Sequence, residues 1–275
     1  MIRALALLLP LCLVVGCRSP GPGIPLPAAD PRPEALLASL QNRVASRSAL
    51  RARANLDLDA PDVRLDRPQR LAVARPARMR VEVLGLFDQL AAVVVTNGER
   101  YQVYDARSDE LEEGLVDAAL LWRVARVDLV PEVAVGILLG APRPDPGLSS
   151  GGARLLEDGA IAFARLDARG VQRESYRFDA TGQIAERASF DAQGDLDWRA
   201  QFSDYRPVRS PAGPEEPFAH DVLLEFPRVS ARAHMVFKQV LLSEELPEAL
   251  FVLQLPDRSS QATTEPAAMG ARITR

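Results

Sequence analysis

The chain has 275 residues, with 33 basic and 37 acidic side chains, a net charge of −4, two cysteines and two histidines. The basic residues, all arginine except Lys238, are interspersed with acidic ones, a distribution without the basic patch that nucleic-acid binding requires. So few cysteines and histidines nearly exclude zinc sites, disulfide frameworks and Cys/His catalysis. We therefore expect no metal, no cofactor and no catalytic residues.

The first residues have the features of a secretory signal. Arg3 is the only charge before an apolar run at residues 4–15, which is too short to span a bilayer as a helix. The sequence Val14-Val15-Gly16-Cys17 resembles the bacterial lipobox, in which a small residue precedes a cysteine that receives acyl chains. An ordinary secretory signal is the alternative. We expect residues 1–16 to be removed and Cys17 to be lipidated, and Arg18 in place of an aspartate favours the outer membrane.

The remaining chain divides into three parts. Residues 17–33 carry prolines at positions 20, 22, 25, 27, 31 and 33, which predicts an extended stalk without helix or sheet. Residues 34–257 have the length of one domain with a sizeable core. Residues 258–275 are polar and small, and we expect a disordered tail.

The first half of the domain predicts one helix followed by strands. Residues 34–47 place leucines and a valine on one helical face, and residues 49–59 alternate apolar and polar side chains as a half-buried strand does. Shorter strands are expected at 71–73 and 78–83. Residues 90–95 are continuously apolar, which predicts a strand covered on both faces, and Asn97-Gly98 predicts a hairpin into 100–105.

Two helices interrupt the strands, and a meander follows. Leu115, Ala118, Ala119 and Trp122 share a helical face, and a second helix is expected to begin at Pro131 and end at Gly140. Residues 149–152 are predicted to form a flexible crossover. Three Asp-x-x-Gly turns then recur every twelve residues, at 167–170, 179–182 and 191–194. Calcium is an alternative reading of these turns, but the ligand set of a calcium loop is missing.

Further strands are expected at 197–205, 218–226 and 233–242, with a last apolar element at 249–255. The sum is about ten or eleven antiparallel strands and three helices. A large antiparallel sheet needs one face covered, so the sequence predicts an α+β fold with a curved sheet wrapped around its helices.

Several segments resemble the LolA/LolB-like family of periplasmic lipoprotein-binding proteins. Residues 78–87, with Pro76 before them, are similar to the family's "P-x-x-x-R-x-E/D-x-x-G-x-F" strand. Residues 93–105 are similar to the next hairpin, and 138–142 to the "L-L-G-x-P" end of the helical pair. Residues 243–251 resemble the family's acidic, proline-containing step into a final strand. The similar segments occur in the family's order between residues 49 and 256.

This resemblance implies an incomplete β-barrel with helices over its concave face, enclosing an apolar cavity for acyl chains. The residues that could line such a cavity, or could simply form core, are Leu56, Met79, Val81, Val83, Leu84, Phe87, Val93, Val95, Trp122, Ile137 and Leu138. LolB also uses a protruding apolar residue to deliver lipoproteins, and Leu86 or Leu90 is the nearest candidate here.

The expected function is that of a lipid-anchored, non-enzymatic carrier or receptor for the acyl chains of lipoproteins. It would be a monomer at the outer membrane, with the domain facing the periplasm. Two alternatives stay open: an envelope sensor or scaffold that binds a protein partner with the same sheet, and a carrier of glycolipid or phospholipid.

Overall fold

The computed structural model describes residues 23–211 and 213–254. Cys17, the expected signal and the expected tail lie outside these residues. The described chain forms one fourteen-stranded sheet in the order β1-β8-β9-β10-β11-β12-β13-β14-β2-β3-β4-β5-β6-β7. Its strands are β1 (Ile24–Pro25), β2 (Ala49–Ala60), β3 (Val63–Ala74), β4 (Arg78–Leu84), β5 (Leu90–Thr96), β6 (Arg100–Asp105), β7 (Glu110–Leu115), β8 (Ser149–Leu155), β9 (Ile161–Leu166), β10 (Gln172–Phe178), β11 (Ile184–Phe190), β12 (Leu196–Arg209), β13 (Glu215–Phe226) and β14 (Ala231–Ser243).

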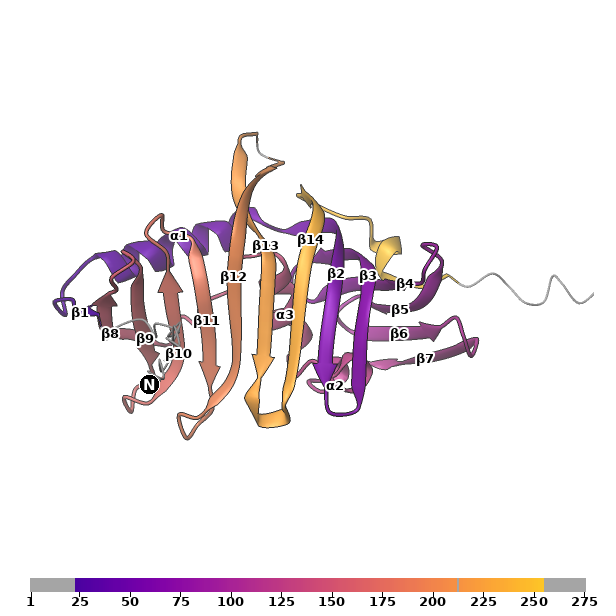
Figure 1. Ribbon diagram of the computed structural model, residues 1–275, viewed down its shortest axis with the longest axis horizontal. Helices are drawn as coiled ribbons and strands as arrows, with labels where there is room; N and C mark the ends of the chain where they lie inside the picture. The colour runs from indigo at the N-terminus through magenta and orange to yellow at the C-terminus, as the bar shows by residue number, and fades with distance from the viewer. Residues whose placement is uncertain (1–22, 212, 255–275) are drawn as a thin grey trace, which may run out of the picture.

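Three α-helices, α1 (Arg32–Ser46), α2 (Leu120–Ala125) and α3 (Pro131–Leu138), lie on the same side of this sheet (Figure 1). We call the side that carries the helices the concave face and the other side the convex face. Leucines of α1 and apolar residues of α3 share one buried cluster with the inward side chains of the strands. Because β1 and β7 end the sheet without pairing to each other, the barrel is incomplete. The predicted α+β fold, a large curved antiparallel sheet with helices over one face, is confirmed.

The sheet has more strands than the ten or eleven expected. Residues 149–155, predicted to include a flexible crossover, form strand β8 instead, with a register shift between Gly151 and Arg154. The predicted stalk is also wrong for its last part, because Ile24–Pro25 pairs with β8 and α1 already begins at Arg32. Proline removes only its own N–H donor, which an edge strand tolerates.

Strand β2 shows the expected alternation. Ala52 lies opposite Val240 of β14 and Leu71 of β3, and all three face the helices. Arg51 and Arg53 point to the exposed convex face. Since successive strand residues point to opposite faces, this register fixes the face of the other residues along these regular strands.

The three Asp-x-x-Gly turns connect β9 to β12 as predicted. Their glycines have φ of 80°, 81° and 88°, the left-handed region that favours glycine. The Asp167 carboxylate accepts hydrogen bonds from the N–H groups of Val171 and Arg169, and these bonds lower its pKa. The same geometry lowers the pKa of Asp191.

The segment after β14 crosses the convex face. Leu246 and Phe251 pack on Ala49, Ala72 and Ala74, which point away from the helices. A final strand was expected at 249–255, but Glu248–Phe251 forms a 3-10 turn. The backbone N–H of Leu253 donates to the side chain of Gln102 rather than to a neighbouring strand.

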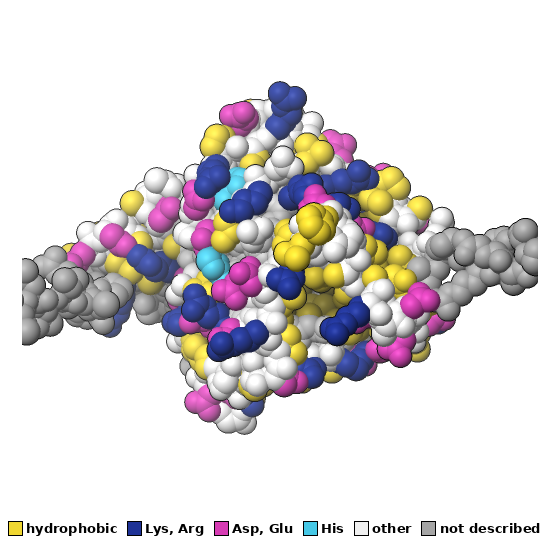
Figure 2. Space-filling view, turned by 45° about the vertical axis from the view of Figure 1, so that its right-hand side comes forward, with side chains coloured by type: hydrophobic (Ala, Val, Ile, Leu, Met, Phe, Trp, Pro, Cys, Tyr) yellow, Lys and Arg dark blue, Asp and Glu magenta, His cyan; other side chains and the backbone are white. Residues whose placement is uncertain are grey.

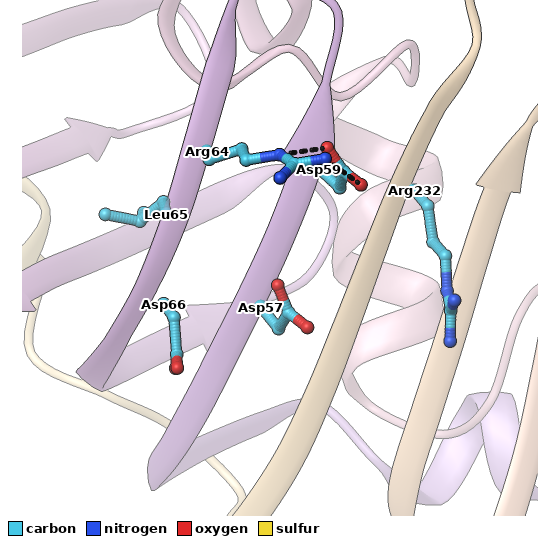
Figure 3. Close-up of a pocket in the computed structure, with 6 residues that line it drawn as sticks. All are labelled: Asp57, Asp59, Arg64, Leu65, Asp66 and Arg232. Atoms are coloured by element: carbon cyan, nitrogen blue, oxygen red, sulfur yellow. Dashed lines mark hydrogen bonds and ion pairs between the residues drawn. The ribbon is translucent and has the colours of Figure 1, made fainter.

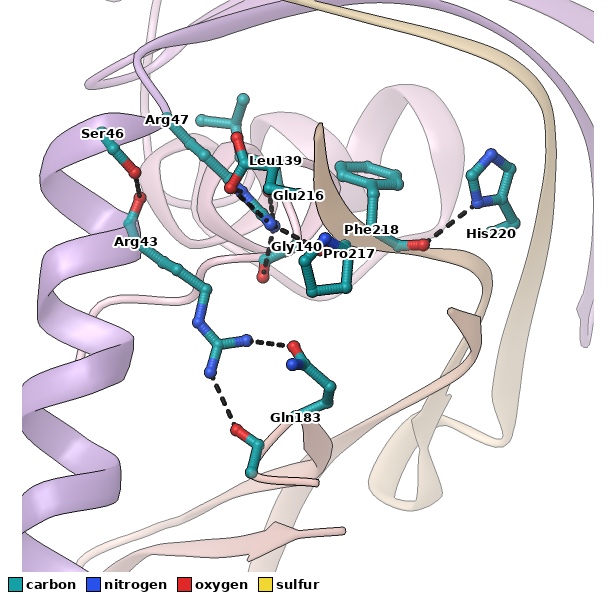
Figure 4. A network of polar contacts seen from close by, with 11 residues as sticks. Arg43, Ser46, Arg47, Leu139, Gly140, Gln183, Glu216, Pro217, Phe218 and His220 are labelled. Atoms are coloured by element: carbon teal, nitrogen blue, oxygen red, sulfur yellow. Dashed lines mark hydrogen bonds and ion pairs between the residues drawn. The ribbon is translucent and has the colours of Figure 1, made fainter. Parts of the chain in front are cut away.

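Arg47, which is 2% exposed, fixes the helices against the sheet (Figure 4). Its guanidinium donates to the carbonyl oxygens of Leu139 and Gly140 at the end of α3, both at 3.2 Å. On the other side it donates to Glu216 at 3.0 Å and to the carbonyl of Pro217 at 2.7 Å, both on β13. One side chain thus joins the ends of α1 and α3 to the sheet.

Candidate functional site

The concave face of β2–β5, beneath α2 and α3, is the apolar surface on which most of the predicted cavity residues meet. The register places Leu71, Val81 and Val94 side by side on β3, β4 and β5. Val73 and Met79 form the next row toward α3. We call this surface, with the facing sides of α2 and α3, the apolar half.

The predicted residues of the apolar half differ in exposure. Met79 is 3% exposed and Ile137 is 0% exposed, so these two are core. The remaining five are half-buried on or against the same face; they are Leu56, Val81, Val83, Trp122 and Leu138. The surface is therefore packed at one end and partly open at the other.

Val93 and Val95 are wrong as cavity residues. They lie opposite Glu82 and Arg80 on β4, so their side chains point to the convex face, away from Met79 and Val81. Both are buried there, at 0% and 1% exposure. A continuously apolar run carries no alternation, so the sequence could not assign a face to each residue. Leu84 is fully buried and pairs with Leu90 after a register shift at the end of β4.

Phe87 is also wrong as a cavity residue, because it is 89% exposed. Together with Leu86, which is 85% exposed, it forms the tip of the turn between β4 and β5, whereas Leu90 is half-buried within β5. The turn is fixed, since the backbone N–H of Phe87 donates to Gln89 Oε1 at 2.8 Å and Asp88 pairs with Arg53 of β2 at 2.7 Å. The hydrogen bond from Arg53 lowers the pKa of Asp88.

Gln69 is a polar residue of the apolar half that the sequence reading missed. It is 0% exposed and lies on β3 between Ala54 of β2 and Val83 of β4. Neither its Oε1 nor its Nε2 has a hydrogen-bond partner among the described residues. A buried polar group without a partner costs about 1–3 kcal/mol. The predicted strand began only at Leu71, after Pro68, and so excluded this position.

The concave face of β9–β12 is built differently, and we call it the charged half. Glu174 and Arg187, both under 8% exposed, form an ion pair at 2.7 Å, and the hydroxyl of Tyr176 donates to Glu174 at 2.9 Å. Arg187 also stacks over the ring of Trp198, 5.2 Å from its centroid. Burial raises the pKa of Tyr176 well above its usual range. Stacked rings of Phe163, Tyr176 and Phe178 fill the space beside this pair.

The convex face carries surface grooves with charged walls. One of about 360 Å³ is lined by Asp57, Asp59, Arg64, Leu65, Asp66 and Arg232 (Figure 3). Another, of about 320 Å³, lies over β2, β3 and β14 and is lined by Arg51, Ala52, Arg53, Arg70, Leu71, Gln239, Val240 and Leu241. Figure 2, which turns these strands toward the viewer, shows a hollow with hydrophobic side chains and basic ones at its rim.

Within residues 23–211 and 213–254, no group of three or more His, Cys, Asp or Glu side chains is arranged to hold a metal ion. None of the helices in these ranges is long and apolar enough to cross a membrane.

Comparison with known proteins identifies the fold. No protein-family model and no curated protein sequence matches the chain. A putative outer membrane lipoprotein-sorting protein domain from Vibrio parahaemolyticus superposes with a TM-score of 0.50 at 11% identity, covering 79% of this chain and 96% of that domain. A DUF1329 family protein from Desulfovibrio piger gives 0.51 at 12% identity, covering 79% and 95%. The chain has the lipoprotein-sorting fold.

A LolA superfamily protein from Nitrosomonas europaea gives a TM-score of 0.49 at 10% identity, covering 79% of this chain and 97% of that one. The domain from Vibrio parahaemolyticus and the protein from Desulfovibrio piger confirm the predicted resemblance at the level of fold alone, because their identities of 11% and 12% are too low to carry a function.

Proposed function

We propose that the chain is a non-enzymatic carrier or receptor that binds the acyl chains of lipoproteins on the concave face of the apolar half. The observation that carries the proposal is the set of half-buried aliphatic side chains there, within a fold shared with a lipoprotein-sorting domain. An acyl chain gains roughly 0.8 kcal/mol per buried methylene, so a modest apolar surface suffices for binding.

The helices over this surface leave a route for a ligand. Trp122 of α2 and Leu138 of α3 are half-buried. Arg126, at the C-terminal end of α2, forms an exposed ion pair at 2.7 Å with Asp62, which lies between β2 and β3. Exposed pairs of this kind contribute at most about 1 kcal/mol. Because Leu120 and Leu121 of the same helix are buried, at 0% and 6% exposure, a ligand would enter beside α2 rather than displace it.

The turn between β4 and β5 would contact the membrane. Leu86 and Phe87 gain about 1.5–3 kcal/mol each when they leave water for an apolar environment. Because Arg53 and Gln89 hold the turn in one conformation, little entropy is lost on insertion. This arrangement supports a LolB-like delivery role at the outer membrane.

Attachment would occur through acylation of Cys17. Because residues 24–33 pack on the sheet edge and begin α1, only residues 18–23 separate Cys17 from the folded domain. Six residues reach at most about 20 Å, so the domain would stay close to the bilayer.

The proposal is tested with the chain carrying Cys17→Ser, titrated with a fluorescent fatty-acid probe and competed with a synthetic diacylated lipopeptide. Leu56→Gln should weaken binding about tenfold, because it removes roughly 1.4 kcal/mol of apolar contact. Leu241→Gln, on the convex face of neighbouring β14 and already 57% exposed, is the matched control and should bind as the parent does.

A chain that binds neither probe nor lipopeptide would contradict the proposal. If crosslinking in cells captured one protein partner and no acylated client, the sensor or scaffold alternative would replace it. If glycolipid or phospholipid competed better than the lipopeptide, the result would favour a carrier of glycolipid or phospholipid.

The delivery step has its own experiment. Leu86→Ser with Phe87→Ser should leave probe affinity unchanged and reduce sedimentation with phosphatidylglycerol-containing vesicles at least fivefold. Leu115→Ser, in edge strand β7 and 69% exposed, is the control for a generic loss of surface apolarity. Equal vesicle binding by the double variant and the control would show that the turn between β4 and β5 does not contact the membrane.

A further inference from the structure

Gln69 occupies a position in the apolar half whose two direct cross-strand partners are hydrocarbon side chains. These partners are Ala54 and Val83. Along β3, the residues two positions away on the same face are the buried Leu71 and the exposed Arg67. The side chain is fully buried, yet both amide atoms lack a hydrogen-bond partner within the described chain. Buried polar groups are nearly always paired in folded proteins, so this amide calls for a partner that the chain does not supply.

The amide lies beside the open end of the apolar surface. Its cross-strand neighbour Val83 is half-buried, and so is Leu56, which is diagonal to it on β2. Cross-strand neighbours are about 5 Å apart and diagonal neighbours about 7–8 Å, so a ligand that covers Val83 and Leu56 comes within reach of Gln69.

Resting on the proposed function, we infer that Gln69 binds the carbonyl linkage of the acyl chain, with Nε2 donating a hydrogen bond to an ester or amide oxygen. A neutral amide has no charge to offer a carboxylate or an ammonium group, and a neutral carbonyl matches its donor. Its Oε1 stays free to accept from an adjacent ligand N–H or O–H. The ligand is therefore a chain attached through an ester or an amide, rather than a simple hydrocarbon tail.

The test compares ligands that differ only in this carbonyl. With the Cys17→Ser chain and the fluorescent fatty-acid probe, we would measure competition by 1-palmitoylglycerol, N-palmitoylethanolamine and 1-O-hexadecylglycerol. The third compound has an ether in place of the carbonyl. We expect the ester, the amide or both to compete about tenfold better than the ether. The compound that competes better, the ester or the amide, identifies the linkage that the site accepts.

Gln69→Met is the informative variant, because it keeps length and volume and removes both polar atoms. It should bring the carbonyl ligands down to the affinity of the ether while leaving ether binding unchanged, with an intact fold by circular dichroism. Equal competition by all three ligands in the parent chain, or discrimination that persists in the variant, would overturn the inference. Failure of every ligand to bind would instead overturn the proposed function as well.

Discussion

The two halves of the concave face both bury polar groups, but among the described residues the charged half pairs most of them and the apolar half leaves Gln69 unpaired. There, Glu174 accepts from Arg187 and from the Tyr176 hydroxyl, and Arg165 donates to two backbone carbonyls. Arg165 and Arg187 each keep one unpaired Nε, yet each guanidinium is otherwise bound. In the apolar half neither amide atom of Gln69 has a partner among the described residues, and its neighbours Val83 and Leu56 are half-buried. The charged half therefore stabilises the fold through its own contacts, whereas the apolar half has the half-buried surface and the unpaired amide that the proposed ligand site requires.

The largest expected effect comes from a substitution that breaks the buried ion pair of the charged half. Arg187→Met leaves the Glu174 carboxylate buried without its cation, which should lower the free energy of unfolding by about 3–5 kcal/mol. Urea denaturation measures this change in the free energy of unfolding. Arg199→Met removes an exposed pair with Glu225 on the same sheet and should cost about 1 kcal/mol or less. Equal losses would show that the charged half is not the stabilising region.

Ile137→Ala tests the packed end of the apolar half. Its side chain is 0% exposed within the main cluster, so truncation should cost about 2–5 kcal/mol. Thermal and urea unfolding give this number, with Leu241→Ala as a surface control within about 0.5 kcal/mol of the parent. A loss below 1 kcal/mol for Ile137→Ala would mean that even this end of the site is loosely filled.

Gln69→Met should act in the opposite direction. Removing an unpaired buried amide should raise the free energy of unfolding by about 1 kcal/mol, although it would weaken ligand discrimination. Urea denaturation without ligand measures the change. A clear loss of stability would show that the amide is satisfied in the folded chain and that the two halves do not differ in this respect.

The smallest effect concerns the meander turns of the charged half. Because the folded-state pKa values of Asp167 and Asp191 are lowered from 3.8, their contribution is present above pH 4 and is lost as the pH falls through the folded values. Replacing both with asparagine should flatten the decline of the melting temperature between pH 5 and pH 3 by about 1–2 °C. Identical pH profiles for the parent and the variant would contradict this reading.

Sequence patterns predicted the parts of the fold that carry a clear period or a turn signal. The alternation of residues 49–59 fixed the faces of β2, and the spaced aspartates and glycines located the hairpins of β9–β12. The continuous run at 90–95 could not assign faces, so Val93 and Val95 were placed on the wrong side. The strand predicted at 71–73 covers only part of β3, Val63–Ala74, and so left out Gln69. Exposure of Phe87 depends on the geometry of its turn, which alternation does not encode.

The most direct measurement of the central claim uses the two tryptophans of the chain, because Trp122 lies over the apolar half and Trp198 lies in the charged half. Single-tryptophan chains carrying Trp198→Phe or Trp122→Phe, each with Cys17→Ser, would be titrated with a fatty acid brominated in mid-chain, which quenches nearby indole fluorescence. Binding of acyl chains in the apolar half predicts saturable quenching of Trp122 and little change at Trp198. Quenching of Trp198 alone, or of neither residue, would contradict the proposal that acyl chains bind in the apolar half.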